Sequence, residues 1–134
     1  MTEVDFLEVT LRVPARADTV FPYFTEPDRH TQWMGSRAVL DPVPGGIYRV
    51  QMHDGVKAMG EFVDVDPPHR IAFTWWTKES AAAPGHTRVV VTLDPAGDGT
   101  QLALRHYDVP GEERAQLREM WQEALRRLAV HARG

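Results

Sequence analysis

The chain has 134 residues, a formal net charge of −4 and no cysteine. This length predicts a single domain over residues 1–134, large enough to bury its own core. Without cysteine there is no disulfide or thiolate site, and no basic cluster indicates binding to nucleic acid. No window of about 18 apolar residues predicts a membrane span, and the first residues are typical of a strand rather than a signal peptide, so we expect a cytoplasmic protein.

The first third of the chain predicts one strand and two short helices. Apolar and polar residues alternate over residues 8–13, which is typical of a half-buried strand, and Pro14 ends it. The first helix is expected over residues 17–24 and the second begins at Pro27, because proline is tolerated in a first turn. The second helix is expected to carry Trp33 and also His30, which we place near the mouth of any cavity that this helix covers.

Six further strands are expected between residues 35 and 106. They cover about residues 35–40, 47–52, 56–65, 71–75, 89–93 and 102–106. The alternation changes phase within residues 56–65, which predicts a β-bulge near Gly60. The loop at residues 81–85 is rich in alanine, proline and glycine, and with the short helices it could form a mobile rim.

The period changes near the C-terminus. From about residue 111 to 132 the apolar residues follow helical spacing, which predicts an amphipathic helix about 30 Å long. Such a helix can cover the apolar face of a curved seven-stranded antiparallel sheet. The order of one strand, two short helices, six strands and a long helix places the chain in the α+β class.

Short motifs follow the same order as these elements. They are Val20-Phe21, Thr25-Glu26-Pro27, Trp33-Met34-Gly35, Pro44-Gly45-Gly46, Gly60, Asp66-Pro67-Pro68-His69-Arg70-Ile71, Phe73-Thr74-Trp75, Gly99-Thr100-Gln101-Leu102, His106 and Trp121. In their number and order they resemble the helix-grip fold of the START-like superfamily, also called Bet v 1-like or SRPBCC. Within it, the chain is most similar to the family of activators of the heat-shock-protein-ninety ATPase.

This resemblance covers nearly the whole chain and implies a deep cavity between sheet and long helix. Members of the superfamily bind or act on hydrophobic small molecules, and some relatives cyclise polyketides. Two positions depart from the family pattern: Met34 stands where a second tryptophan is frequent, and Met120 where glycine is frequent. Both departures are expected to alter the lining of the cavity rather than the fold.

The side chains expected to face the long helix form what we call the predicted wall. They are Phe24, Trp33, Tyr48, Val50, Met52, Phe62, Phe73, Trp75, Val89, Val91, Leu102, Leu104, His106, Trp121 and Leu125. The pattern by itself fits an ordinary packed core, whereas the resemblance favours a ligand pocket, which is typically apolar with a few polar groups. We expect the indoles of Trp33, Trp75 and Trp121 to converge.

His106 is the most informative polar residue of the predicted wall. A buried imidazole is expected to be neutral, so it could orient a ligand or act as a general base, or a neighbour could satisfy it. Tyr48 could supply a second polar contact. No catalytic motif and no metal-ligand spacing is present, so neither a metal nor another cofactor is expected.

Three functions fit these features. The first, which we favour, is binding of a hydrophobic small molecule, with no catalytic residue. The second is a polyketide cyclase or dehydratase-like enzyme that uses His106 and Tyr48 in the same cavity. The third is an interaction module associated with the heat-shock chaperone, and a homodimer through sheet edges is compatible with any of the three.

Overall fold

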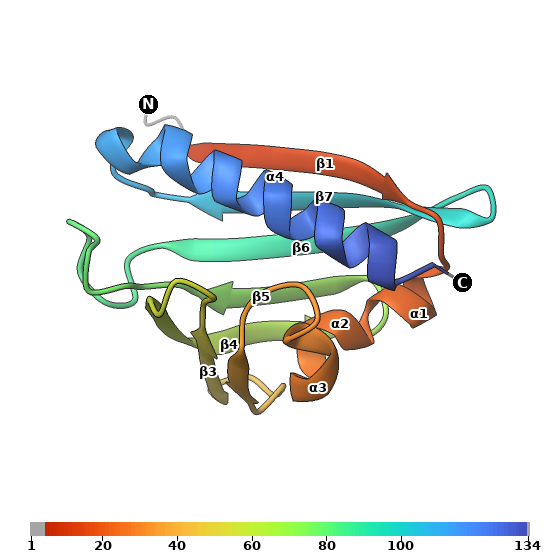
Figure 1. Cartoon of the computed structure of the whole chain (residues 1–134), viewed down its shortest axis with the longest axis horizontal. Helices are drawn as coiled ribbons and strands as arrows, with labels where there is room; N and C mark the ends of the chain where they lie inside the picture. The colour runs from red at the N-terminus through yellow and green to blue at the C-terminus, as the bar shows by residue number, and fades with distance from the viewer. Residues whose placement is uncertain (1–4, 134) are drawn as a thin grey trace.

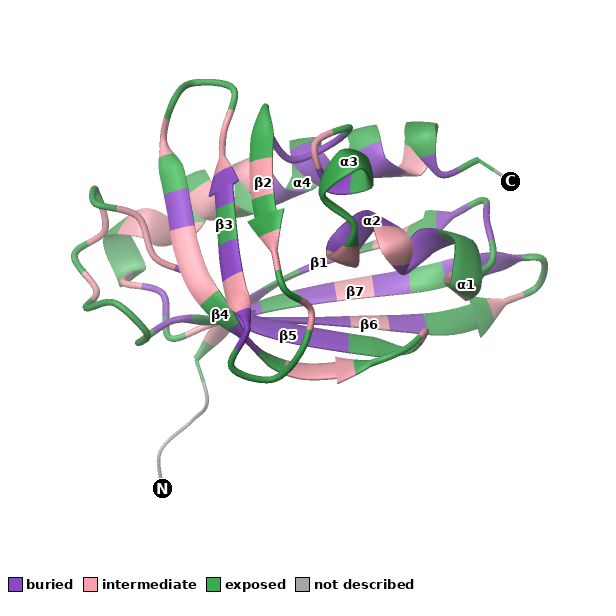
Figure 2. Cartoon of the chain, turned by 90° about the horizontal axis from the view of Figure 1, so that it is seen from below, coloured by how far each residue is buried: buried purple, intermediate pink, exposed green. Residues whose placement is uncertain are grey.

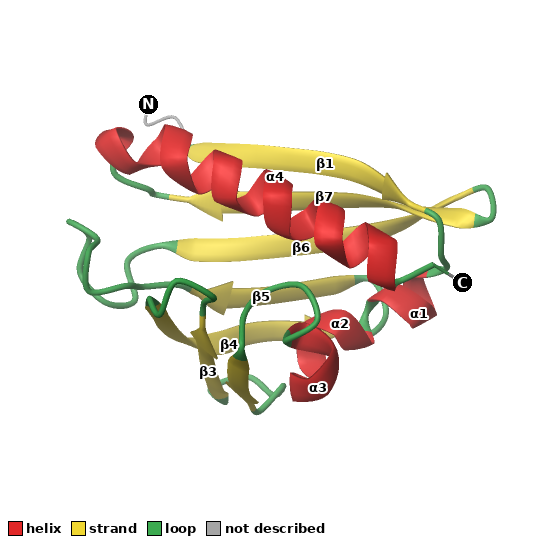
Figure 3. Ribbon diagram, viewed as in Figure 1, coloured by secondary structure: helices red, strands yellow, loops and turns green. Residues whose placement is uncertain are grey.

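Seven antiparallel strands form one sheet in the computed structural model, which describes residues 5–133 (Figure 3). The strands are β1 (Phe6–Val13), β2 (Arg37–Leu40), β3 (Ile47–Gln51), β4 (Lys57–Asp66), β5 (Arg70–Thr74), β6 (Arg88–Ala96) and β7 (Gly99–Tyr107). Their spatial order is β1-β7-β6-β5-β4-β3-β2, so β1 and β2 are the two edges. The segment that joins β1 to β2 must therefore cross from one edge of the sheet to the other.

The helices lie to one side of this sheet. They are α1 (Ala17–Val20), α2 (Pro22–Thr25), α3 (Pro27–His30), the 3₁₀ turn η1 (Gly111–Glu113) and α4 (Arg114–His131). In Figure 1, α4 runs across the part of the sheet that contains β1, β7 and β6, and the three short helices gather near its C-terminal end. This arrangement confirms the predicted α+β helix-grip fold with a long C-terminal helix on the sheet.

The segment after β1 holds three single-turn helices where two were predicted. The expected first helix is divided at Phe21, whose N–H still donates to the carbonyl of Ala17 at 2.9 Å. The next residue, Pro22, has no N–H and cannot continue the helical hydrogen bonds, so a new turn starts there. Trp33, expected on the second helix, lies in the turn that follows α3.

The bulge in β4 lies later than predicted. Its register shifts between Phe62 and Asp64, rather than near Gly60. Gly60 serves a different purpose, because a Cβ atom there would lie 1.9 Å from the carbonyl oxygen of Thr74. Glycine therefore permits the close backbone approach of β4 to the end of β5, and the bulge farther along changes which side chains face the core.

The core occupies most of the space between the sheet and α4. On the helix, Trp121, Ala124, Leu125 and Leu128 are buried. On the sheet, buried positions alternate with more exposed ones along β1, β3 and β7, as Figure 2 shows for β3, whereas β5 and β6 each hold three consecutive buried residues. Burying one large apolar side chain contributes about 1.5–3 kcal/mol, so this interface is the main source of stability. In the described part of the chain, no helix is long and apolar enough to cross a membrane.

Candidate functional site

Nearly all of the predicted wall is core. Every one of its side chains is buried except that of Met52, which is partly exposed at the end of β3. The two ends of the space between sheet and α4 differ, however. We call the end near α3 and the C-terminus of α4 the closed end, and the end near the start of α4 the open end.

A hydrogen-bonded cluster that the sequence did not predict lies at the closed end. His30 is fully buried, with Nδ1 at 2.9 Å from the carbonyl oxygen of Tyr23 and Nε2 at 2.9 Å from the hydroxyl of Tyr48. A carbonyl only accepts, so Nδ1–H donates to Tyr23 and the Tyr48 hydroxyl donates to Nε2. The indole N–H of Trp33 donates to the same carbonyl at 2.9 Å. The prediction that His30 lies at a cavity mouth was wrong.

Burial controls the ionisation of this cluster. Desolvation lowers the pKa of His30 to about 4, although its bond to the Tyr23 carbonyl acts in the opposite direction. Burial also raises the pKa of Tyr48 well above its usual range. Both groups are therefore neutral near pH 7, as the hydrogen-bond directions require.

Aromatic rings fill the remaining space at the closed end. The ring of Tyr48 stacks on that of Phe73 with centroids 4.1 Å apart, and the edge of Phe62 meets Tyr48 at 5.7 Å. Phe24 packs edge-on against Trp33 at 5.1 Å. This packing leaves the hydroxyl of Tyr48 directed at His30 rather than at a ligand.

His106 is enclosed in a second hydrogen-bonded chain. The indole N–H of Trp121 donates to Nδ1 of His106 at 3.2 Å, and Nε2–H of His106 donates to the hydroxyl of Thr87 at 3.1 Å. That hydroxyl donates in turn to the carbonyl of Trp75. Burial lowers the pKa of His106 to about 3, so the ring is neutral and both of its nitrogens already have partners.

The three tryptophans of the predicted wall do not all meet. The rings of Trp75 and Trp121 lie 5.0 Å apart, close to His106. Trp33 belongs to the closed end, where its ring meets that of His30 at 5.0 Å. The prediction of a single convergence was therefore wrong for Trp33.

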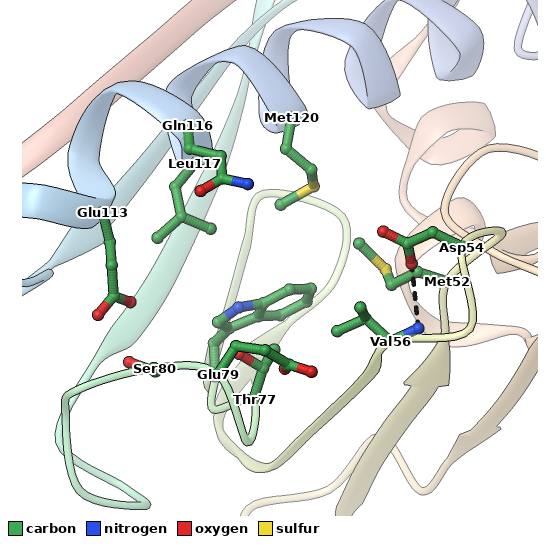
Figure 4. Close-up of a pocket in the computed structure, with 11 residues that line it drawn as sticks. Met52, Asp54, Val56, Thr77, Glu79, Ser80, Glu113, Gln116, Leu117 and Met120 are labelled. Carbon is green, nitrogen blue, oxygen red and sulfur yellow. Dashed lines mark hydrogen bonds between the residues drawn. The ribbon is translucent and has the colours of Figure 1, made fainter.

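A pocket of about 210 Å³ lies at the open end (Figure 4). It is lined by Met52, Asp54, Val56, Trp75, Thr77, Glu79, Ser80, Glu113, Gln116, Leu117 and Met120. These residues come from η1, the first turns of α4, the β3–β4 hairpin, and the end of β5 with the loop that follows it. The pocket has an apolar floor, because the side chains of Met52, Val56, Leu117 and Met120 face one another across it.

The polar groups of the pocket lie mostly at its rim. The carboxylate of Glu113 accepts the N–H of Ala81 at 2.8 Å, which attaches the loop after β5 to the start of α4. The indole N–H of Trp75 forms no hydrogen bond with residues 5–133, unlike the indoles of the other tryptophans. Within these residues, every fully buried side-chain nitrogen has a hydrogen-bond partner. This N–H is therefore accessible, and the pocket residue Trp75 can donate it to a ligand.

Sequence reasoning found only part of this pocket. Met52 and Trp75 belong to the predicted wall, and Leu117 and Met120 belong to the apolar stripe of the C-terminal helix. The polar residues of the rim could not be predicted from the sequence, because single polar residues in turns are typical of any protein surface. Leu117 and Met120, which are three residues apart and precede Trp121, could have indicated which part of the helix lines the pocket.

Residues that could hold a metal are not grouped in the described chain. Within residues 5–133, no three or more histidine, aspartate or glutamate side chains lie close enough together to hold a metal ion. The donors that the pocket offers are the Trp75 N–H, the side-chain amide of Gln116 and the hydroxyls of Thr77 and Ser80, and its acceptors include three carboxylates. The arrangement suits non-covalent binding of a molecule with an apolar body.

Comparison with solved structures identifies the fold in other proteins. CalU16 from Micromonospora echinospora has a TM-score of 0.82 and 25% identity, with 98% of this chain and 76% of that chain covered. DynU16, described as a protein in the dynemicin biosynthetic locus, has a TM-score of 0.82 and 30% identity over 95% of this chain. The aligned region is 46% of DynU16, so this chain corresponds to about half of that protein.

A third structure is PFC0360w, an HSP90 activator from Plasmodium falciparum. It has a TM-score of 0.80 and 24% identity, with 93% of this chain and 94% of that chain covered, and this likeness concerns the fold alone. None of the curated proteins matches the chain. The family model for Activator of Hsp90 ATPase homolog 1-like protein matches residues 14–133. The chain thus belongs to this family, whose helix-grip fold is typical of proteins that bind hydrophobic ligands.

Proposed function

We propose that this protein binds a hydrophobic small molecule in the pocket at the open end. The observation that carries the proposal is the pocket of about 210 Å³ between sheet and α4, at the one end where the predicted wall does not fill the interface. Its floor is formed by Met52, Val56, Leu117 and Met120, and binding pockets are characteristically apolar with a few polar groups. The family fold and the biosynthetic locus of DynU16 support the same function.

The size of the pocket limits the ligand. Pockets for drug-sized molecules enclose roughly 300–1,000 Å³, more than the volume of this one. The pocket therefore accepts a small aromatic molecule whole, or the apolar end of a larger one whose remainder lies over the rim. The indole N–H of Trp75 is placed to fix the orientation of an acceptor on the ligand.

Binding can be tested with a neutral hydrophobic probe. We expect N-phenyl-1-naphthylamine to bind the native protein and to increase in fluorescence in the apolar floor. Met120→Trp fills the floor and is expected to abolish binding. The matched control, Val130→Trp, adds the same ring to an exposed position of α4 and should bind as the native protein does. Unchanged binding by Met120→Trp would overturn the proposed site.

The natural ligand can be sought in the same protein. Native protein purified without denaturation is extracted, and the extract is compared by mass spectrometry with that of Met120→Trp. A compound present only in the native extract supports the proposal. Failure of both this comparison and the probe titration would exclude ligand binding at the open end.

The enzyme hypothesis lacks the groups on which it depended. It required His106 or Tyr48 to point into open space, and both side chains are fully buried with their polar atoms hydrogen-bonded to protein. We therefore assign binding rather than catalysis to the pocket.

Association with the heat-shock chaperone is the remaining alternative. It rests on the family description and on the name of the P. falciparum structure. A pull-down with the purified heat-shock ATPase tests it independently of the pocket. Capture by the native protein and by Met120→Trp alike would indicate a surface function that is separate from ligand binding.

A further inference from the structure

We infer that the open-end pocket selects ligands that carry a cationic group beside their apolar body. This inference rests on the proposed function and specifies the class of molecule that the same site takes. It is argued from the sign of the charges around the rim, the absence of cations among the lining residues, and an aromatic ring in the lining.

Three carboxylates from three separate segments line the pocket. Asp54 comes from the β3–β4 hairpin, Glu79 from the loop after β5, and Glu113 from η1. Figure 4 shows Glu113 on the side of α4 and Asp54 and Glu79 on the side of the sheet, so the charges surround the pocket. The fold, rather than one acidic run of sequence, brings them together.

These carboxylates are not neutralised by basic side chains. No lysine, arginine or histidine lines the pocket, although Lys57 and Lys78 are sequence neighbours of lining residues. Across residues 5–133, every ion pair involves other carboxylates. Asp54 and Glu113 each accept one backbone N–H, which leaves acceptor sites on both groups free for a ligand.

The lining of the pocket also contains an aromatic ring that can attract a cation. The ring is that of Trp75, and an indole face attracts ammonium groups within about 6 Å of the ring centroid. A ligand can thus bury its apolar body among Met52, Leu117 and Met120 while its positive group lies toward the rim. An anionic ligand of the same shape would meet three like charges, which selects against it.

This acidic rim does not simply reflect the net charge of −4. A groove on the outer face of β2, β3 and β4 has the opposite character, because Arg37, Arg49 and Lys57 line it without any aspartate or glutamate. The charges of the protein are therefore separated in space. The negative sign at the open end is a local property of the pocket.

The inference can be tested with three probes that share one naphthyl ring. They are 1-naphthylmethylamine, 1-naphthylmethanol and 1-naphthoate, which are cationic, neutral and anionic near pH 7. We expect the amine to bind about fivefold more tightly than the alcohol, since partly exposed charge pairs and cation–π contacts are individually weak. We expect the naphthoate to bind most weakly, and added salt to reduce these differences.

Variants identify the carboxylates as the cause. The isosteric double variant Glu79→Gln with Glu113→Gln should reduce the preference for the amine over the alcohol, because only Asp54 and the Trp75 ring still favour a cation. Glutamine at position 113 can still accept the N–H of Ala81. Glu119→Gln removes the same type of charge from an exposed position of α4 outside the pocket, and it should keep the preference for the amine.

The outcomes separate this inference from the proposed function. Equal binding of amine and alcohol by the native protein would overturn the inference and leave the hydrophobic pocket standing. Loss of the preference in Glu119→Gln as well would also overturn it, because net charge would then be the cause. If none of the three probes binds and N-phenyl-1-naphthylamine also fails, both proposals fall.

Discussion

The two ends of the helix–sheet interface are built from similar side chains but in different ways. At the closed end, buried hydrogen bonds join three elements: His30 on α3 bonds both the Tyr23 carbonyl of α2 and the Tyr48 hydroxyl of β3. At the open end, apolar side chains surround an unfilled space, and the polar groups face the rim. The first end specifies the fold, and the second leaves room for a ligand.

The attachment of α4 explains where the space occurs. Near its C-terminus, the Tyr23 hydroxyl donates to the carbonyl of His131 at 2.9 Å, and Arg127 donates to the carbonyl of Trp33 at 3.1 Å. Near its N-terminus, Arg114 bonds Asp5 and the carbonyl of Phe6, beside β1. The helix is thus held close at one end, while at the other it is held toward β1 and away from the β3–β4 hairpin.

The largest expected effect is the difference in stability between the two ends. Phe24→Ala at the closed end leaves a cavity among fully buried rings, and it should lower the free energy of unfolding by about 3–5 kcal/mol. Met120→Ala at the partly exposed pocket wall should lower it by less than about 1 kcal/mol, because little new buried cavity forms. Urea unfolding measures both, and equal losses would contradict the distinction between the ends.

Acid is expected to destabilise the fold through its two buried histidines. The pKa values of His30 and His106 are lowered to about 4 and about 3, whereas an unfolded histidine titrates near 6.5. The unfolded chain therefore binds more protons below pH 6.5, and stability falls as the pH decreases from there toward about 4. At pH 5 each histidine should reduce stability by about 2 kcal/mol relative to pH 7.

Chemical denaturation at pH 7 and pH 5 measures this loss, and NMR titration shows which rings remain neutral. His69→Gln, which removes an exposed histidine, serves as the control and should leave the pH dependence unchanged. Protonation of His30 or His106 near pH 6 in the folded protein would show that the ring is more accessible than the structure indicates.

Tyr48→Phe tests the hydrogen bond at the closed end with almost no change in shape. The ring still stacks on Phe73, but Nε2 of His30 loses its donor and is left buried without a partner. The free energy of unfolding should fall by about 1–3 kcal/mol. Binding of N-phenyl-1-naphthylamine should not change, and a large loss of binding would mean that the ligand reaches Tyr48 after all.

The smallest effect is expected at the rim. Glu113→Ala removes the acceptor of the Ala81 N–H and so releases the loop after β5 from the start of α4. Hydrogen exchange should accelerate at Ala81 and its neighbours, while global stability changes by less than about 1 kcal/mol. Glu112→Ala is the control, because Glu112 is exposed on the same turn and does not line the pocket.

Most of the fold could be predicted, because its signals are local. Alternation along β3 and β6, and the helical period of α4, depend only on which faces are buried. The misplaced bulge in β4 and the divided first helix were harder to predict. Both depend on where a regular series of backbone hydrogen bonds is interrupted, which is after Phe62 in β4 and at Pro22 in the helical segment. Several positions in the sequence fit such an interruption equally well.

The site could be predicted only in part. Met52 and Trp75 line the pocket, but most of the predicted wall is buried among its own side chains. Inward-facing residues follow the same sequence spacing and are of the same apolar types whether they pack in a core or line a pocket. Volume decides between them, and volume depends on how closely α4 approaches the sheet at each point.

The sequence by itself determined the strand and helix order, the antiparallel sheet and the burial of its aromatic face. The spacing of apolar residues along each segment is enough to show its type and its buried face. Only the tertiary structure decided that His30 pairs with Tyr48 and that His106 bonds Trp121 and Thr87, since these partners are far apart in the chain. It also decided where the interface stays open. The reason is that close packing depends on how all elements of the fold are placed together. The attachments of α4 produce close packing against the sheet at its C-terminal end only.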